Sequence, residues 1–93
     1  MRTIRRTARF RRDYKRMAKG RYGAILDTEL RTVLALLIED NDLPETYRDH
    51  ALTGDWNGYR DCHLRPDLLL IYAKLYDKEL TLVRLGSHSD LGW

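Results

Sequence analysis

The spacing of apolar residues predicts two helices in the first half of the chain. Phe10, Tyr14 and Met17 recur at helical intervals and form one apolar stripe, with charged residues between them. A stronger helical pattern covers roughly Ile25 to Glu39. Its apolar stripe consists of Leu26, Leu30, Val33, Leu34 and Leu37. Because only a short link containing two glycines separates the two patterns, we expect a helical hairpin.

The second half of the chain changes to the patterns typical of strands and turns. We expect strands over residues 2–6, 59–64, 68–73 and 80–87, with turns at residues 57–58, 65–67 and 76–78. Residues 68–73 are apolar throughout, which predicts a central strand buried on both faces. If the last strand is regular, Leu80, Leu82 and Arg84 share one of its faces.

These elements give a β-αα-βββ order in a single domain over residues 1–93. The predicted class is α+β, with the helical hairpin packed on a mainly antiparallel four-stranded sheet. If strands 59–64 and 80–87 flank strand 68–73, both run in the same direction, and their ends lie at the same edge of the sheet. His63 and His88 stand at those ends, and Asp67 begins the return strand, so we expect the three to converge.

Positive charge is concentrated at the start of the chain. Residues 1–22 hold ten of the 17 Lys and Arg but only one of the 14 acidic residues, although the net charge is only +3. Such asymmetry predicts a polyanionic partner for the first helix, while a solvated basic face without a partner is the alternative. The basic positions of this helix are Arg9, Arg11, Arg12, Lys15 and Arg16.

Length and cysteine content narrow the class of protein. At 93 residues, with 43% hydrophobic and 33% charged residues, the chain fits one small globular domain. It contains no apolar run of about 20 residues, and the basic N-terminus lacks the hydrophobic segment of a secretory signal. We therefore expect a cytoplasmic protein with no membrane partner. The single cysteine, Cys62, excludes an internal disulfide and a multi-cysteine metal site.

Titratable side chains crowd the segment from residue 47 to residue 67, which includes His50 and His63. Two histidines can act as general base and general acid at neutral pH. RNA supplies its own nucleophile, the 2′-OH, so histidines and a cation such as Arg84 suffice to cleave it without metal or cofactor. Three alternatives stand beside this interpretation. They are histidines without a catalytic role, a zinc site made of two histidines and an aspartate, and a non-catalytic nucleic-acid-binding module.

The same residues carry a resemblance to the RelE/ParE superfamily of bacterial toxins, and most closely to its YafQ-type mRNA interferases. The matching motifs are Tyr47-Arg48-Asp49-His50, Gly54-x-Trp56-x-Gly58-Tyr59-Arg60-Asp61-x-His63, Pro66-Asp67-x-x-Leu70-Ile71-Tyr72 and Arg84-x-Gly86-x-His88. The resemblance implies a toxin of a type II toxin–antitoxin pair, an endoribonuclease that cuts mRNA codons in the ribosomal A site without metal.

The resemblance also implies roles for individual residues. The catalytic positions are His50, His63, Asp67 and His88, with His50 as the general base and His88 as the general acid. The expected contacts to the substrate or the transition state are Arg84, Trp93 and Asp61. Trp93 stands where the family has a C-terminal aromatic residue, but one position further from the histidine than usual.

The implied partners are the 70S ribosome with its mRNA and a cognate antitoxin of the DinJ/RelB type. Operator DNA is expected only through the antitoxin, and the basic first helix is expected to contact ribosomal RNA. A rival within the superfamily is a ParE-like toxin that poisons gyrase. That branch lacks the histidine set found here.

Overall fold

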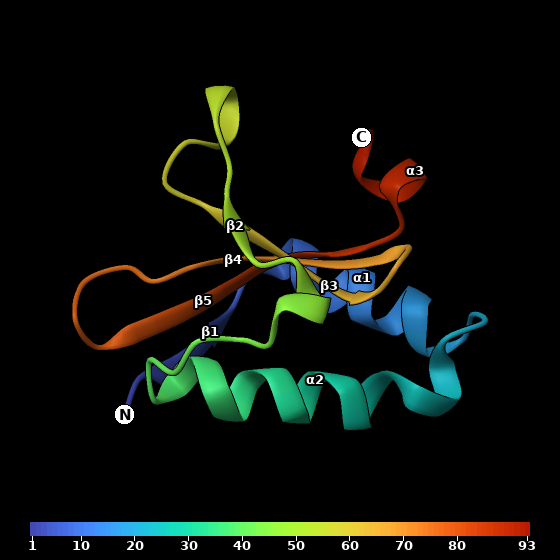
Figure 1. The fold of residues 1–93 in the computed structure, drawn as a ribbon. Coiled ribbons are helices and arrows are strands. Elements are labelled where there is room, and N and C mark those ends of the chain that lie inside the picture. The colour runs from blue at the N-terminus through green and yellow to red at the C-terminus, as the bar shows by residue number, and fades with distance from the viewer.

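A computed structural model describes residues 1–93 and shows two helices under one face of a five-stranded sheet (Figure 1). The strand order is β1-β5-β4-β3-β2, and only the β1–β5 pair is parallel. The strands are β1 (Thr3–Arg6), β2 (His50–Ala51), β3 (Arg60–Arg65), β4 (Leu68–Ala73) and β5 (Glu79–Gly86). The helices are α1 (Ala8–Ala18), α2 (Gly23–Ile38) and α3 (His88–Leu91), with 3-10 turns η1 (Glu45–Tyr47) and η2 (Gly54–Trp56).

The predicted α+β fold is confirmed, and all four expected strands are present. Two short elements, β2 and α3, were not predicted from the sequence. A two-residue strand shows no alternation, and a four-residue helix shows no apolar stripe, so neither leaves a periodic signal. Strand β2 pairs with β3 at one edge of the sheet, and the segment from β2 to η2 and the C-terminal α3 rise above the face opposite the long helices (Figure 1). None of the helices is long and apolar enough to cross a membrane.

Strand β4 is buried along its whole length, as its composition predicts. Every second residue, namely Leu68, Leu70 and Tyr72, faces the helices and joins the hydrophobic core. From below, α1 and α2 contribute Phe10, Leu26, Leu30, Val33 and Leu37 to that core. Cys62 also lies in this layer and is fully buried, so burial raises the pKa of its thiol. A buried, protonated thiol is a packing residue rather than a nucleophile.

Strand β5 is not regular, which corrects the predicted face of Arg84. Arg84 pairs with Ile71 but Leu82 pairs with Tyr72, so Val83 is an extra residue in the ladder. This bulge turns Leu80, Leu82 and Leu85 toward the helices and places Arg84 on the other face. The apolar positions shift phase at this point, from Leu80 and Leu82 to Val83 and Leu85, and the expectation of a regular strand overlooked this shift.

A buried carboxylate on α1 closes the outer edge of β5. Strand β1 covers this edge only as far as Leu82, whose carbonyl accepts a hydrogen bond from the Thr7 amide. Beyond that point, Asp13 accepts hydrogen bonds from the Leu85 amide (3.0 Å) and from the Arg84 guanidinium (2.7 Å). Burial by itself raises the pKa of Asp13, but these hydrogen bonds and the charges of Arg84 and Arg16 outweigh it and lower the pKa. Asp13 thus satisfies a strand edge that would otherwise stay open.

The substitution Asp13→Ala is expected to lower the free energy of unfolding by about 3–5 kcal/mol, because it leaves a buried guanidinium and a strand amide without partners. The folded pKa of Asp13 lies below its usual value of 3.8, so its contribution exists above about pH 4 and is lost as the pH falls. Urea denaturation between pH 2 and pH 7 measures both effects.

The matched control is Asp42→Ala, since Asp42 is exposed and makes no ion pair or side-chain hydrogen bond. We expect this control to change stability by less than about 0.5 kcal/mol. Equal losses in the two variants would show that Asp13 does not hold the edge of β5.

Candidate active site

The three histidines lie in one row on the face of the sheet that the long helices do not cover. His50 comes from β2, His63 from β3, and His88 is the first residue of α3. The ring centroids of His50 and His63 are 6.4 Å apart, and those of His63 and His88 are 5.7 Å apart. The expected convergence is therefore observed, with His63 in the middle. It follows from the antiparallel pairing of β4 with both β3 and β5.

The ring of His50 is oriented by a backbone carbonyl. Its Nδ1 lies 2.7 Å from the carbonyl oxygen of Arg48. A carbonyl can only accept, so Nδ1 carries the proton and donates it, which leaves the lone pair of the neutral ring on Nε2. Arg48 ends the η1 turn in the left-handed region, with φ 50°. This backbone conformation presents the carbonyl to the ring two residues later.

The ring of His88 is oriented by a carboxylate instead. Asp67 Oδ1 accepts a hydrogen bond from the backbone amide of His88 (2.9 Å) and another from its Nδ1 (2.6 Å). The amide hydrogen bond first, and then the side-chain hydrogen bond and charge of His88, lower the pKa of Asp67. Asp67 is thus ionised at neutral pH, and its negative charge is placed to stabilise a proton on this imidazole.

The first turn of α3 is held by its own cap. The Ser87 hydroxyl accepts from the Asp90 amide, and the Asp90 carboxylate accepts from the Ser87 amide, a capping box. The turn packs so closely on β5 that a Cβ at Gly86 would lie 2.9 Å from the Cβ of Asp90. Glycine at this position therefore allows α3 to begin where it does, and α3 in turn positions His88 over Asp67.

Asp61 lies between His50 and His63 and is buried, with 3% of its surface exposed. Its Oδ2 lies 3.7 Å from Nε2 of each histidine, and its Oδ1 has no hydrogen-bond partner. Burial raises the pKa of Asp61, against the opposing effect of the His63 and His50 rings. An incompletely paired carboxylate at such a place costs stability and increases the local negative potential between the two rings.

Aromatic side chains stand next to the end of the row that carries His88. Trp56 of η2 contacts Trp93 edge to face, with ring centroids 6.0 Å apart, and contacts Tyr59 at 5.5 Å. The amide of Trp93 donates to the carbonyl of His88 at 2.8 Å, and its side chain is exposed. The structure thus places Trp93 near the histidines, although its position in the sequence is shifted by one residue.

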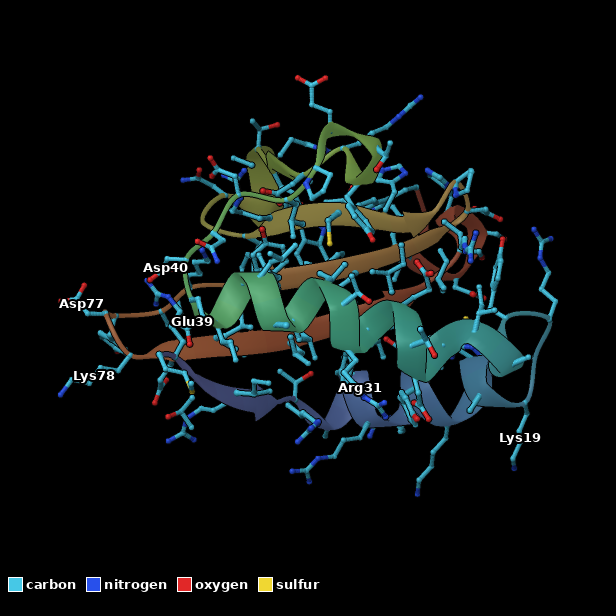
Figure 2. All side chains as sticks on the ribbon, turned by 60° about the horizontal axis from the view of Figure 1, so that its bottom comes forward. Lys19, Arg31, Glu39, Asp40, Asp77 and Lys78 are labelled. Atoms are coloured by element: carbon cyan, nitrogen blue, oxygen red, sulfur yellow. The ribbon has the colours of Figure 1, made fainter.

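The other predicted site residues lie apart from the row. The Arg84 side chain is 12% exposed, and its charge is balanced by Asp13 rather than free over the histidines. The five basic residues of α1 are exposed on the helical side of the molecule, where Arg31 of α2 and Lys19 also lie (Figure 2). Among these five, Arg16 also pairs with Asp13 at 3.1 Å.

Two features of the site could not be found from the sequence. The carbonyl that orients His50 belongs to Arg48, and no sequence signal marks an arginine as left-handed. A pocket of about 880 Å³ next to His63 and His88 includes Glu29 from α2, which is far away along the chain. No three His, Cys, Asp or Glu side chains are arranged to hold a metal ion.

The structure defines a small α+β protein with a row of three histidines on one face of its sheet, and comparison with known proteins identifies its family. The family model described as the bacterial toxin of type II toxin–antitoxin systems, YafQ, matches residues 2–92. The chain belongs to this family of toxins.

Individual relatives agree with this assignment. The mRNA interferase toxin YafQ of Escherichia coli strain B is 41% identical over 91 residues, which cover 97% of this chain and 95% of that protein. The toxin in a crystal structure of the E. coli DinJ–YafQ complex is 39% identical, with a TM-score of 0.83 and 98% of each chain covered. A metal-bound toxin from Helicobacter pylori is 38% identical, with a TM-score of 0.83 over 98% of this chain and 99% of that one.

The substitution Asp61→Asn is expected to raise the free energy of unfolding at pH 7 by about 1 kcal/mol, because it removes a buried charge without changing the shape of the side chain. The pKa of Asp61 is raised in the folded state, so its unfavourable effect develops as the pH rises from the usual value of 3.8 through the folded pKa and is complete above it. The gain of the variant is therefore present at pH 7 and disappears toward pH 3. Chemical denaturation at both pH values measures it, and a loss of stability at pH 7 would contradict this account.

The substitution Gly86→Ala is expected to displace α3 and to lower RNA cleavage by about 10-fold or more, because an added Cβ would overlap Asp90. The cross-peak between Asp67 and the His88 ring in NMR spectra should weaken in this variant. The control is Gly20→Ala, because a Cβ there meets nothing closer than 3.6 Å. Normal cleavage by the Gly86 variant would show that the position of α3 is unimportant.

Proposed function

We propose that this toxin is an mRNA endonuclease that acts on the ribosome and cuts the codon in the A site by acid–base catalysis without metal. Its membership of the YafQ toxin family and the mRNA interferase names of its relatives support the enzyme class. The observation that carries the mechanism is the unequal orientation of two histidines. A neutral carbonyl holds Nδ1 of His50, and a carboxylate holds Nδ1 of His88.

His50 is the general base in this proposal. Because its Nδ1–H is donated to Arg48, the Nε2 lone pair of the neutral ring is free to remove the proton of a ribose 2′-OH. The 2′-oxygen then attacks the adjacent phosphorus, and a bond forms between them. The attack needs no water and no further nucleophile, since the RNA supplies both the alkoxide and the phosphate.

His88 is the general acid. Asp67 accepts its Nδ1–H, which directs Nε2 away from this carboxylate, and in the proposed step Nε2–H donates its proton to the leaving oxygen. As the bond between phosphorus and the 5′-oxygen breaks, this proton moves to the 5′-oxygen. The products are a 2′,3′-cyclic phosphate and a 5′-hydroxyl. Exchange with solvent water then removes the added proton from His50 and returns a proton to His88, which restores the initial protonation states.

His63 lies between the base and the acid, where the phosphate must sit. We assign it, rather than Arg84, the stabilisation of the pentavalent phosphorane, because the Arg84 charge is already balanced by Asp13. Asp61 Oδ2 is 3.7 Å from Nε2 of both His63 and His50, so its negative charge lies beside the phosphate-facing ring and beside the ring that takes up the 2′-OH proton. Trp93 is placed to contact a neighbouring nucleotide by stacking on a base.

The partners follow from the same proposal. The exposed basic residues of α1 would contact phosphates of ribosomal RNA, which predicts binding that weakens steeply with salt. A ribosomal target places the activity in the cytoplasm. The DinJ–YafQ complex supports a cognate antitoxin of the DinJ type, through which operator DNA would be bound. A gyrase poison, or a regulator that only binds nucleic acid, would have no use for the histidine row.

The substitution His88→Ala is expected to slow mRNA cleavage by about 10²–10⁴-fold while binding to ribosomes is retained, because only the proton donor is lost. Cleavage of a reporter mRNA in a translation extract, and co-sedimentation with ribosomes, measure the two quantities. The matched control is Ser89→Ala, which changes the next, exposed residue of α3. Parallel loss of cleavage and of ribosome binding in the His88 variant would refute a chemical role.

Chelators test the metal-free step. EDTA at concentrations that leave ribosomes intact is expected not to change the cleavage rate, because every proton transfer is assigned to a side chain. Inhibition by EDTA that added zinc reverses would contradict the mechanism and revive the zinc alternative. This test matters because a relative from H. pylori is described as metal-bound.

A further inference from the structure

We propose that the pocket between η1, the end of β3 and α2 holds the nucleobase of the nucleotide on the 3′ side of the scissile phosphate, and that Arg65 and Glu29 read its polar edge. This inference rests on the proposed function and adds to it a specificity site. The pocket has a volume of about 880 Å³, which lies within the range of small-ligand sites in proteins.

The position of the pocket relative to the histidines selects the 3′ nucleotide. His63 and His88 line it, but His50 does not. The general acid His88 must contact the leaving 5′-oxygen, which belongs to the nucleotide 3′ of the cut. Consider an RNA strand with its scissile phosphate at His63 and its leaving 5′-oxygen at His88. The 3′ nucleotide of this strand points toward the pocket, and its 5′ nucleotide points toward His50.

The lining of the pocket suits a base edge. Glu29 and Arg65 form an ion pair at 3.3 Å across its wall, and both side chains keep part of their surface exposed. A guanidinium donates to ring nitrogens and carbonyl oxygens, and a carboxylate accepts from exocyclic amines, so together they can discriminate bases. RNA-binding proteins commonly read unstacked bases along these edges.

A protein segment is a weaker candidate for the pocket. Binding of a peptide from a partner generally needs an exposed apolar anchor. Only Tyr47 and Leu64 supply hydrophobic side chains here, and Leu64 is 4% exposed. Apart from the Pro66 ring, the remaining walls carry carboxylates, guanidinium groups, imidazoles and a hydroxyl, a composition that favours a polar ligand rich in donors and acceptors.

Arg48 joins the pocket to the chemistry. It lines the pocket, its backbone is left-handed, and its carbonyl holds the Nδ1–H of the general base. Strained backbone at such positions is typical of functional sites. A nucleobase bound against Arg48 would therefore contact the segment that orients His50. This contact would link recognition of the 3′ nucleotide to the positioning of the general base.

The test compares Arg65→Ala and Glu29→Gln with the wild-type toxin on reporter mRNAs that carry each of the four nucleotides 3′ to a mapped cut. The ratio of cleavage rates among the 3′ nucleotides should change by about 10-fold in each variant. The preference for the 5′ nucleotide should stay unchanged. The matched control is Arg5→Ala, which removes an ion pair with Glu79 at 2.8 Å on the β1–β5 side of the sheet. It should leave both preferences as in the wild type.

Several results would overturn the inference while leaving the proposed function intact. They are a wild-type toxin indifferent to the 3′ nucleotide, unchanged 3′ preferences in both pocket variants, and a pocket whose variants alter only binding to the antitoxin. Cleavage that survives His88→Ala would instead refute the proposed mechanism. The two failures are thus distinguishable within one set of cleavage maps.

Binding of single nucleotides gives a readout that does not require cleavage or the ribosome. NMR titration of the purified toxin with millimolar 5′-AMP, 5′-GMP, 5′-CMP and 5′-UMP should shift the amide signals of Leu64 and Arg65, by different amounts for different bases. Arg65→Ala should remove the difference between bases, and its folded spectrum would exclude unfolding as the cause. Equal shifts for all four nucleotides, or no shifts at these amides, would contradict the proposal.

Discussion

The antiparallel pairing of β4 with both of its neighbours is the constraint on which the site depends. Because β3 and β5 run in the same direction on either side of β4, their ends meet at one edge of the sheet. His63 lies near the end of β3, His88 follows the end of β5, and Asp67 lies in the turn that precedes β4. The apolar sequence of β4 secures this arrangement, since the strand is buried on both faces and can only be central. Core packing and catalytic geometry are therefore set by the same pairing.

In the proposed mechanism, two histidines take different roles because their Nδ1 atoms have different hydrogen-bond partners. The partner of His50 is the neutral carbonyl of Arg48, whereas the partner of His88 is the carboxylate of Asp67. This arrangement lowers stability locally, because Arg48 adopts a left-handed backbone and Asp61 is buried with an unpaired oxygen. The helical hairpin and Asp13 at the edge of β5 offset this loss of stability. The hydrophobic core on one face of the sheet thus stabilises the fold that holds the histidine row on the other face.

The sequence predicts the layers of the fold because periodic burial decides them. The stripe of α2 and the apolar run of β4 both appear in the structure within two residues of their expected bounds. The convergence of His63 and His88 followed from strand direction alone. The two-residue strand at His50 and the left-handed Arg48 did not follow, because each depends on tertiary contacts of single residues. For the same reason, the ion pair between Arg84 and Asp13 could not be predicted from the sequence. The bulge at Val83 was marked only by a shift in the apolar positions of the strand.

The chemical structure of the cut RNA ends shows whether the 2′-OH is the attacking nucleophile. Wild-type toxin and a variant with alanine at His50, His63 and His88 would be expressed, and the ends of a cleaved reporter mRNA determined. Attack by the 2′-OH predicts 2′,3′-cyclic phosphate and 5′-hydroxyl ends in phase with codons, all absent with the triple variant. Ends with a 3′-hydroxyl, cuts that persist in the triple variant, or growth arrest without cuts would contradict the account.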